Sequence, residues 1–312
     1  MFGIKTKIKR YIAHCISATW SSPQNKPLEA LSFNKKYKVF IPTYERSRQI
    51  VHPDILVRKD SPKFVLAFTP YPNTNDKFEN PSIVISDNGL HFHEEKEGIN
   101  PIVPAPAKDH NDDPDLTFNN GIYQLLYLET VRPDYQNLML LTSTDRLNWN
   151  KQILHSESPV GKKDGFMLSP ALAYFGKDCF LFAVKKDLAN GNSLFAVKGT
   201  DISNLNFTNN IELKLNNISN NFQPWHVDVF KDENDGYVML LSMVTPYTSK
   251  KKEYALFIAT SKNMIDWNFQ NKPVLTNAYR STGFIKDGVL YIYFSSNVYA
   301  DVWKTGIYKV AL

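Results

Sequence analysis

The feature of this sequence that most constrains its fold is a repeat that runs through most of the chain. Five segments share one layout: a polar or proline-containing start, a short apolar strand, a turn, and a second strand rich in aromatic residues. When the segments are aligned, one position is held by Asp54, Asp115, Ala171, Asp228 and Gly283, at intervals of 61, 56, 57 and 55 residues. Such a constant period indicates a repeat architecture.

Each repeat has the strand and turn signals of a small antiparallel sheet. The five segments are HPDILVRKDSPKFVLAFTPYP from residue 52, DDPDLTFNNGIYQLLYLET from 112, LSPALAYFGKDCFLFAVKK from 168, QPWHVDVFKDENDGYVMLLSMV from 223 and YRSTGFIKDGVLYIYFSSN from 279. Their internal turns are rich in Gly, Asn and Asp, the residues of tight hairpins. A further hairpin, such as YQNLMLLTSTDRLNWNKQIL, brings each unit to about four strands.

Four-stranded units repeated around an axis are the blades of a propeller. We therefore predict an all-β fold over residues 39–312, a five-bladed β-propeller with four-stranded antiparallel blades. The last repeat has room for only three strands, so we expect KYKVFIPT, residues 36–43, to supply its fourth strand and close the ring. Closure of this kind removes exposed sheet edges.

Residues 1–38 are predicted to form an N-terminal extension with a short helix. Four cations between Lys5 and Arg10 precede YIAHCISA, and the apolar residues recur at three- and four-residue spacing, as in a basic helix at a membrane surface. A helix packed on the domain fits equally well. The apolar run is interrupted by polar residues, which argues against a secretory signal. We expect a cytoplasmic protein, with membrane association through this helix as an alternative.

Composition excludes several classes of function. The formal net charge of +5 is mild and its cations are scattered, so no nucleic-acid footprint is present. Cys15 and Cys179 form neither a disulfide framework nor a zinc motif. No nucleotide-binding, zinc-protease or serine-hydrolase motif occurs, and we expect no organic cofactor.

The repeat predicts where a functional site would lie. The first strand of every blade begins near the axis, so residues at the repeat starts become neighbours. Carboxylates gathered there repel one another unless they bind a cation or a ligand, or share protons. The candidates at the repeat starts are His52, Asp54, Asp113, Asp115, Trp225, His226, Asp228 and Arg280. A cation such as calcium is compatible with the carboxylates, although no loop has the spacing of a dedicated calcium site.

Five blades of this length with acidic residues at their first strands resemble the five-bladed β-propeller glycoside hydrolases, such as families 43, 32, 117 and 130. In that group a blade-one aspartate acts as base or nucleophile, a role the resemblance places on Asp54. A blade-two aspartate orients it and tunes its pKa, which implies Asp115 or Asp113. Cleavage of a glycosidic bond uses two carboxyl groups of this kind.

The third repeat departs from that group. Many members carry a glutamate general acid there, whereas this chain has Ala171 after Ser-Pro. Alanine delivers no proton, so His226, Asp228 or Glu79 would have to replace the acid. A histidine is suitable because its ordinary pKa lies near neutrality.

Two loops add binding candidates to the site. The stretch after the second strand of the first repeat contributes Tyr71, Glu79 and Asn80, and a proline-rich loop leads to His110. Long loops with polar tips commonly line binding clefts. Trp225 is expected either to stack on a sugar or to pack in the core.

Two hypotheses follow for function. The first is a glycoside hydrolase-like enzyme acting on an oligosaccharide or polysaccharide at the propeller axis, with Asp54, Asp115, His226 and Asp228 as catalytic residues. The alternative is a glycan-binding or transferase-like protein of cell-surface polysaccharide biosynthesis, which the missing glutamate favours.

Overall fold

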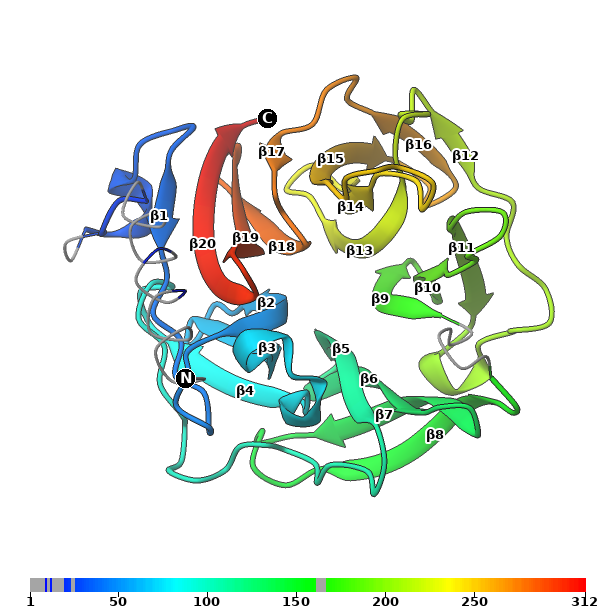
Figure 1. Cartoon of the computed structure of the whole chain (residues 1–312), viewed down its shortest axis with the longest axis horizontal. Coiled ribbons are helices and arrows are strands. Elements are labelled where there is room, and N and C mark those ends of the chain that lie inside the picture. Colours follow the sequence, from blue (N-terminus) through cyan, green and yellow to red (C-terminus); the bar gives the residue numbers. More distant parts are fainter. Residues whose placement is uncertain (1–8, 10–11, 13–19, 24–25, 161–166) are drawn as a thin grey trace.

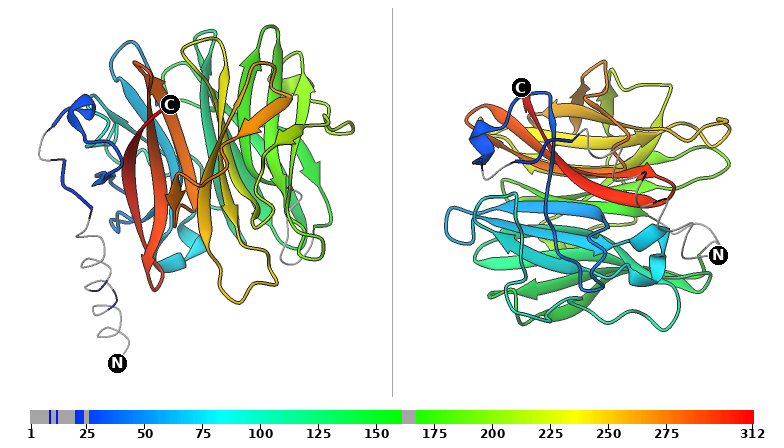
Figure 2. Two further views of the ribbon diagram at one scale, coloured as in Figure 1. Left: turned by 90° about the horizontal axis from the view of Figure 1, so that it is seen from above. Right: turned by 60° about the vertical axis from the view of Figure 1, so that its left-hand side comes forward.

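The computed structural model describes residues 9, 12, 20–23, 26–160 and 167–312. It forms a closed ring of five sheets around a central axis (Figure 1). Edge-on views show the sheets side by side, with their strands running between the two faces of the ring (Figure 2). The all-β, five-bladed propeller predicted from the repeat is therefore confirmed.

Each blade begins with its innermost strand. Blade one contains β2 (Ile50–Val57), β3 (Phe64–Pro70) and β4 (Ser82–Ser86), and blade two contains β5 (His110–Asn119), β6 (Ile122–Val131), β7 (Tyr135–Ser143) and β8 (Asn150–Glu157). Blade three contains β9 (Leu168–Phe175), β10 (Asp178–Lys185) and β11 (Ser193–Gly199).

The last two blades carry additional strands at their outer sides. Blade four contains β13 (Gln223–Lys231), β14 (Tyr237–Val244), β15 (Tyr254–Ser261) and β16 (Asp266–Phe269), with β12 (Lys214–Asn216) and β17 (Leu275–Thr276) added at its outer side. Blade five contains β18 (Arg280–Lys286), β19 (Val289–Tyr299) and β20 (Val302–Ala311), followed by β1 (Lys36–Lys38). The described residues also hold short 3₁₀ helices at Leu28–Ala30, Pro72–Thr74, Asp76–Phe78 and Ile202–Asn204.

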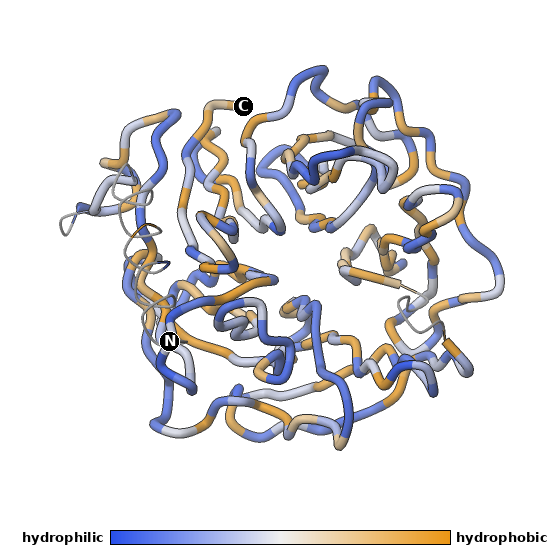
Figure 3. The backbone as a smooth tube through the Cα atoms, viewed as in Figure 1, coloured by the Kyte–Doolittle hydropathy of each residue, from blue (hydrophilic) through white to orange (hydrophobic). Residues whose placement is uncertain are grey.

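The ring closes as predicted, because β1 pairs antiparallel with β20. This strand begins at Lys36, just before the predicted propeller boundary at residue 39. Each face of a blade packs on the neighbouring blade. Consecutive residues of one strand, such as Leu126 and Tyr127, belong to different interfaces, as the period of two requires. Figure 3 shows the resulting hydrophobic strands and more polar outer loops.

The prediction of four strands in every blade is wrong for blades one and three, which have three. In blade one the fourth position is reduced to a single bridge between Ile85 and His93. The following residues, 94–106, are rich in charges and prolines, and proline lacks the N–H that a ladder needs. In blade three only a bridge between Ala196 and Ile211 remains, where the chain is rich in Asn.

The predicted N-terminal helix lies almost entirely outside the described residues, and so does its proposed membrane contact. Among the residues that are described, no helix is long and apolar enough to cross a membrane.

Candidate functional site

The blade starts form two layers of side chains around the axis. The layer nearer the start of the inner strands consists of His52, Asp113, Ser169, His226 and Arg280, and we call it the entrance layer. The lower layer lies two residues further along each strand and consists of Asp54, Asp115, Ala171, Asp228 and Thr282. The sequence alignment put Gly283 in the lower layer, one residue too late.

Hydrogen bonds between blades define the lower layer. Asp54 accepts from the backbone N–H of Leu116, Asp115 from Leu172, and Asp228 from Gly283. Thr282 completes the pattern, because its hydroxyl accepts from the N–H of Ile55. Each of these side chains therefore joins its blade to the next one, a structural task that is independent of catalysis.

Burial raises the pKa of the three lower carboxyl groups. Burial raises the pKa values of Asp54 and Asp115. The pKa of Asp115 lies well above its usual range because the Asp54 and Asp228 carboxyl groups are also close. The pKa of Asp228 is about 7, raised by burial and by Asp54. Carboxyl oxygen atoms of Asp54, Asp115 and Asp228 lie within 4.8 Å of one another. The three residues border a pocket of about 340 Å³ on the face opposite the entrance layer. An all-oxygen set of this kind suits calcium.

The entrance layer is built on strained backbone. His52, Asp113 and Ser169 have φ angles of 53°, 51° and 53°, and each precedes a proline. Left-handed geometry at a residue other than glycine costs about 1–3 kcal/mol, and such positions cluster at functional sites. At the same positions the register of β2 with β3, and of β5 with β6, is shifted. The strain turns these three side chains toward the axis region, where they contact other blades.

Asp113 is the centre of the entrance layer. Its Oδ1 lies 3.4 Å from His52 Nε2, 3.3 Å from His226 Nδ1 and 2.9 Å from Arg280 Nη1. Its Oδ2 accepts from the backbone N–H of Ser169 at 2.9 Å. Burial disfavours the carboxylate, but the His52, His226 and Arg280 groups outweigh burial and hold the pKa of Asp113 well below its usual value.

The two histidines of the entrance layer have lowered pKa values. Both are almost fully buried, and burial lowers the pKa of each, for His52 to well below its ordinary value. His52 Nδ1 has Thr69 Oγ1 at 3.1 Å and Glu79 Oε2 at 3.5 Å. The same Nδ1 accepts from the backbone N–H of Asp113 at 3.4 Å, and Nε2 faces the Asp113 carboxylate.

These atoms have the spacing of metal ligands. Within the described part of the chain, His52 Nε2 and both ring nitrogens of His226 are buried without a hydrogen-bond partner. Ligand atoms about 2.0–2.1 Å from a tetrahedral zinc ion lie about 3.3–3.4 Å apart, which is the observed distance from Asp113 to each ring. Two imidazoles and one carboxylate suit zinc or a similar transition metal better than calcium. Arg280 Nη1 contacts the same Oδ1 of Asp113, so the guanidinium already balances part of the carboxylate charge.

Glu79 is the nearest further carboxyl group. It is 5% exposed, and burial raises its pKa well above the usual range, with Asp112 and Asp113 adding to the effect and His110 opposing it. Its Oε2 has no hydrogen-bond partner. Glu79, whose pKa is raised, and Asp113, whose pKa is lowered, form a pair of carboxyl groups suited to moving protons.

The remaining predicted residues surround this cluster. Asn80 accepts from Asn111, and Arg280 also donates to the carbonyl oxygen of Pro114. His110 contacts Asp109 at 2.7 Å and Asp112 at 3.0 Å. Burial favours neutral His110, but the nearby carboxylates outweigh it and raise its pKa to about 11. His110 is therefore a fixed cation behind Glu79.

Aromatic rings border the other side of the cluster. Trp225 contacts His226 and Tyr279, with ring centroids 5.5 and 5.9 Å apart. Tyr279 is 4.9 Å from Trp303, which is 5.5 Å from Tyr71. Tyr279 and Trp303 were not predicted as site residues, because aromatic residues are common in every strand of this sequence.

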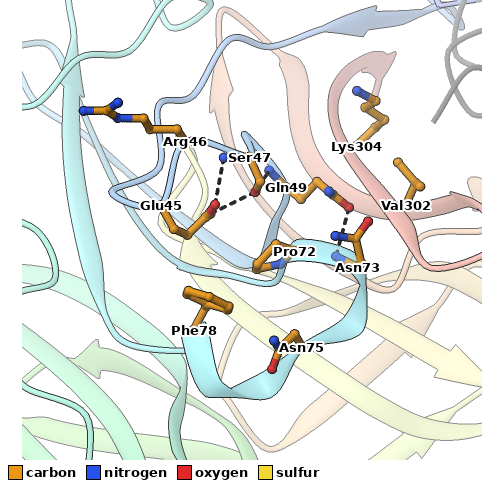
Figure 4. A pocket seen from close by; sticks show the side chains of 10 residues that line it. All are labelled: Glu45, Arg46, Ser47, Gln49, Pro72, Asn73, Asn75, Phe78, Val302 and Lys304. Carbon is orange, nitrogen blue, oxygen red and sulfur yellow. Dashed lines mark hydrogen bonds between the residues drawn. The ribbon is translucent and has the colours of Figure 1, made fainter. Parts of the chain in front are cut away.

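A separate pocket of about 630 Å³ lies beside the cluster and shares none of its residues. Figure 4 shows Gln49 there, accepting from the backbone N–H of Asn73. The same Gln49 oxygen accepts from the N–H of Trp303, and Pro72 follows Tyr71. The pocket therefore adjoins the aromatic border.

The structure thus separates the predicted residues into groups. His52, Glu79, Asp113, His226 and Arg280 meet in one cluster. Asp54, Asp115 and Asp228 meet in a different one, and Tyr71, Asn80, His110 and Trp225 lie around the first. The catalytic roles of all of these residues stay predictions.

Comparison with known proteins supports the fold. No protein-family model matches the sequence. The A type blood N-acetyl-alpha-D-galactosamine deacetylase of Flavonifractor plautii is 36% identical over 76 residues, which are 23% of this chain and only 10% of that protein.

Solved structures match over most of the chain. An N-acetylgalactosamine deacetylase from F. plautii, crystallised with blood group B trisaccharide, superposes with a TM-score of 0.72 at 19% identity, covering 88% of this chain and 94% of that one. A thermostable family-43 glycoside hydrolase gives 0.62 at 14% identity, with coverages of 85% and 89%. An endo-arabinase from Bacteroides thetaiotaomicron gives 0.59 at 16% identity, with 88% and 98%. The predicted resemblance to five-bladed glycoside hydrolases is confirmed at the level of the fold.

Proposed function

We propose that this protein is a carbohydrate-active hydrolase that reacts at the entrance layer and removes an acetyl group from an N-acetylated sugar. The observation that carries the proposal is the convergence of buried, unpartnered nitrogens of His52 and His226 on Asp113 at metal-ligand spacing. The deacetylase that shares the fold, and a short stretch of sequence, supports the choice of bond.

The residues present fit a divalent transition metal held by His52, Asp113 and His226. When bound, such an ion polarises an amide carbonyl and lowers the pKa of water. In this proposal Glu79 would take a proton from water and return it to the sugar nitrogen as the carbon–nitrogen bond breaks. The products are acetate and an amino sugar. Arg280 and the Ser169 N–H hold the Asp113 carboxylate in place.

Cleavage of a glycosidic bond is the second candidate. It is favoured by the pairing of Glu79, whose pKa is raised, with Asp113, whose pKa is lowered. In this reaction Glu79 would protonate the leaving oxygen and Asp113 would act as base. The base role expected for Asp54 would then move to the entrance layer, while Asp54 keeps its bond to Leu116.

The direction of the pH dependence separates the two reactions. As a base in deacetylation, Glu79 must be ionised, so kcat/KM rises with pH through its raised pKa. As an acid in glycosidic cleavage it must be protonated, so kcat/KM falls over the same range.

The test is a panel of N-acetylated sugars and nitrophenyl glycosides, with free acetate and released reducing ends measured separately. We expect acetate release by the wild type, its loss on treatment with a chelator, and recovery with zinc. Asp113→Asn should lose at least about 100-fold in kcat/KM, the usual scale for a positioned catalytic group. Asp134→Asn, on the exposed turn between β6 and β7, is the matched control.

Release of reducing ends without acetate would replace the first candidate by the second. Binding of a glycan without any turnover would support the non-hydrolytic role in polysaccharide assembly. A protein that neither binds nor converts any member of the panel refutes the proposed function.

A further inference from the structure

Two buried hydrogen-bond donors at the start of β13 have no acceptor among the described residues. Gln223 Nε2 and Trp225 Nε1 are both without a partner, and each residue is 8% exposed. A buried donor without an acceptor has lost its hydrogen bonds to water with no replacement, and buried polar groups are nearly always paired. Two such donors, two residues apart in β13, therefore point to a ligand that supplies oxygen acceptors.

The amide of Gln223 is held in a fixed orientation. Its Oε1 accepts from the backbone N–H of Asn192 at 3.0 Å. Asn192 is itself fixed, because its side chain donates to the Pro224 carbonyl at 2.8 Å and accepts from Tyr247 at 2.9 Å. With Oε1 committed to blade three, the Nε2 donors are presented in advance to an external acceptor, which lowers the cost of binding.

Trp225 adds an aromatic surface beside these donors. Its ring lies 6.1 Å from that of Tyr254 and 5.9 Å from that of Tyr279, and Lys252 Nζ lies 4.3 Å from its centroid. Aromatic rings with polar tips and adjacent donors combine an apolar body with hydrogen bonding. That combination suits a sugar, which has an apolar ring face and oxygen atoms at its rim.

Gln223 lies further along β13 from the axis cluster than Trp225, whose ring centroid is 5.5 Å from that of His226. Gln223 is three residues before His226, a separation of up to about 10 Å along an extended strand. The acetyl group must meet Glu79 and His52, so Gln223 is placed to reach the next unit of a sugar chain.

We propose that Gln223 and Trp225 form a subsite for the sugar next to the reacting one, so that the protein prefers oligosaccharides to free monosaccharides. This inference rests on the proposed function and deepens it. The Nε2 group of Gln223 and the Nε1–H of Trp225 bind hydroxyl or ring oxygens of the neighbouring sugar.

The test compares kcat/KM for N-acetylgalactosamine and N-acetylglucosamine with kcat/KM for trisaccharides that end in each. Gln223→Glu keeps the oxygen that binds Asn192 and replaces the donors by an acceptor, and Trp225→Phe keeps a ring but removes the N–H. Each change should lower the ratio of trisaccharide to monosaccharide kcat/KM about tenfold, the effect of one lost hydrogen bond. Gln152→Glu, at an exposed position of β8, is the control and should leave the ratio unchanged.

Failure of the subsite proposal can be distinguished from failure of the proposed function. A wild type that converts both kinds of sugar, with a ratio that Gln223→Glu and Trp225→Phe do not change, refutes the subsite and leaves the hydrolase standing. If the wild type converts neither, calorimetric titration with the same trisaccharides decides: binding weakened about tenfold in Gln223→Glu supports the subsite, and absence of binding refutes it.

Discussion

The lower layer makes a quantitative prediction about Asp228→Asn. Asp228 has a pKa of about 7 in the folded chain, against an ordinary value of 3.8. Between these values the folded chain holds one proton more than the unfolded chain, so raising the pH favours unfolding. The stabilisation is fully present below about pH 4 and is lost as the pH rises through about 7.

The magnitude follows from the difference of about three pKa units. At about 1.4 kcal/mol per unit, this carboxyl group lowers the free energy of unfolding by up to about 4 kcal/mol between pH 4 and pH 8. The value is an upper bound for one residue, because Asp54 and Asp115 titrate together with it. Asparagine resembles the protonated acid in shape, and its oxygen can still accept from the Gly283 N–H.

Urea unfolding at pH 5 and pH 8, with a chelator present, measures the effect. We expect the wild type to lose stability between these values and Asp228→Asn to lose less, so that the variant is the more stable protein at pH 8. Asp134→Asn removes one exposed charge and should follow the wild type. Equal pH dependence in Asp228→Asn and the wild type would refute the reasoning.

Three further predictions concern other parts of the molecule. Glu79→Gln should reduce kcat at least about 100-fold and flatten the kcat/KM profile on its acid side, and a profile identical to that of the wild type would exclude Glu79 from proton transfer. Calcium at about 100 times its dissociation constant should stabilise the folded wild type by about 2.7 kcal/mol at pH 8. In a thermal melt, Asp54→Asn should abolish the resulting rise in the melting temperature. An equal rise in both proteins would exclude the lower layer as the calcium site. Leu240 lies at the fully buried interface of blades four and five, and Leu240→Ala should lower the free energy of unfolding in urea by about 2–5 kcal/mol. Leu147 is 39% exposed, and Leu147→Ala should change this free energy little. Equal losses of stability in the two variants would contradict the packing argument.

The sequence by itself determined the number of blades, the closure of the ring and the residues that reach the axis. These features depend on local turns and on a repeat period, both of which are properties of the linear chain. The same period failed for the outer strands of blades one and three, because prolines, charges and Asn-rich turns there leave only single bridges. The period also misplaced the lower layer in blade five by one residue, at Gly283 in place of Thr282, where hydrogen bonds between blades define the register.

Only the tertiary structure decided which residues share a site. Asp113 and Asp115 are two positions apart in one strand, yet the first meets His52 and His226 while the second bonds to Leu172. The physical reason is that left-handed backbone at His52 and Asp113 changes the direction of their side chains, and the partners of each side chain come from other blades. Such contacts join residues more than fifty positions apart and leave no local trace in the sequence.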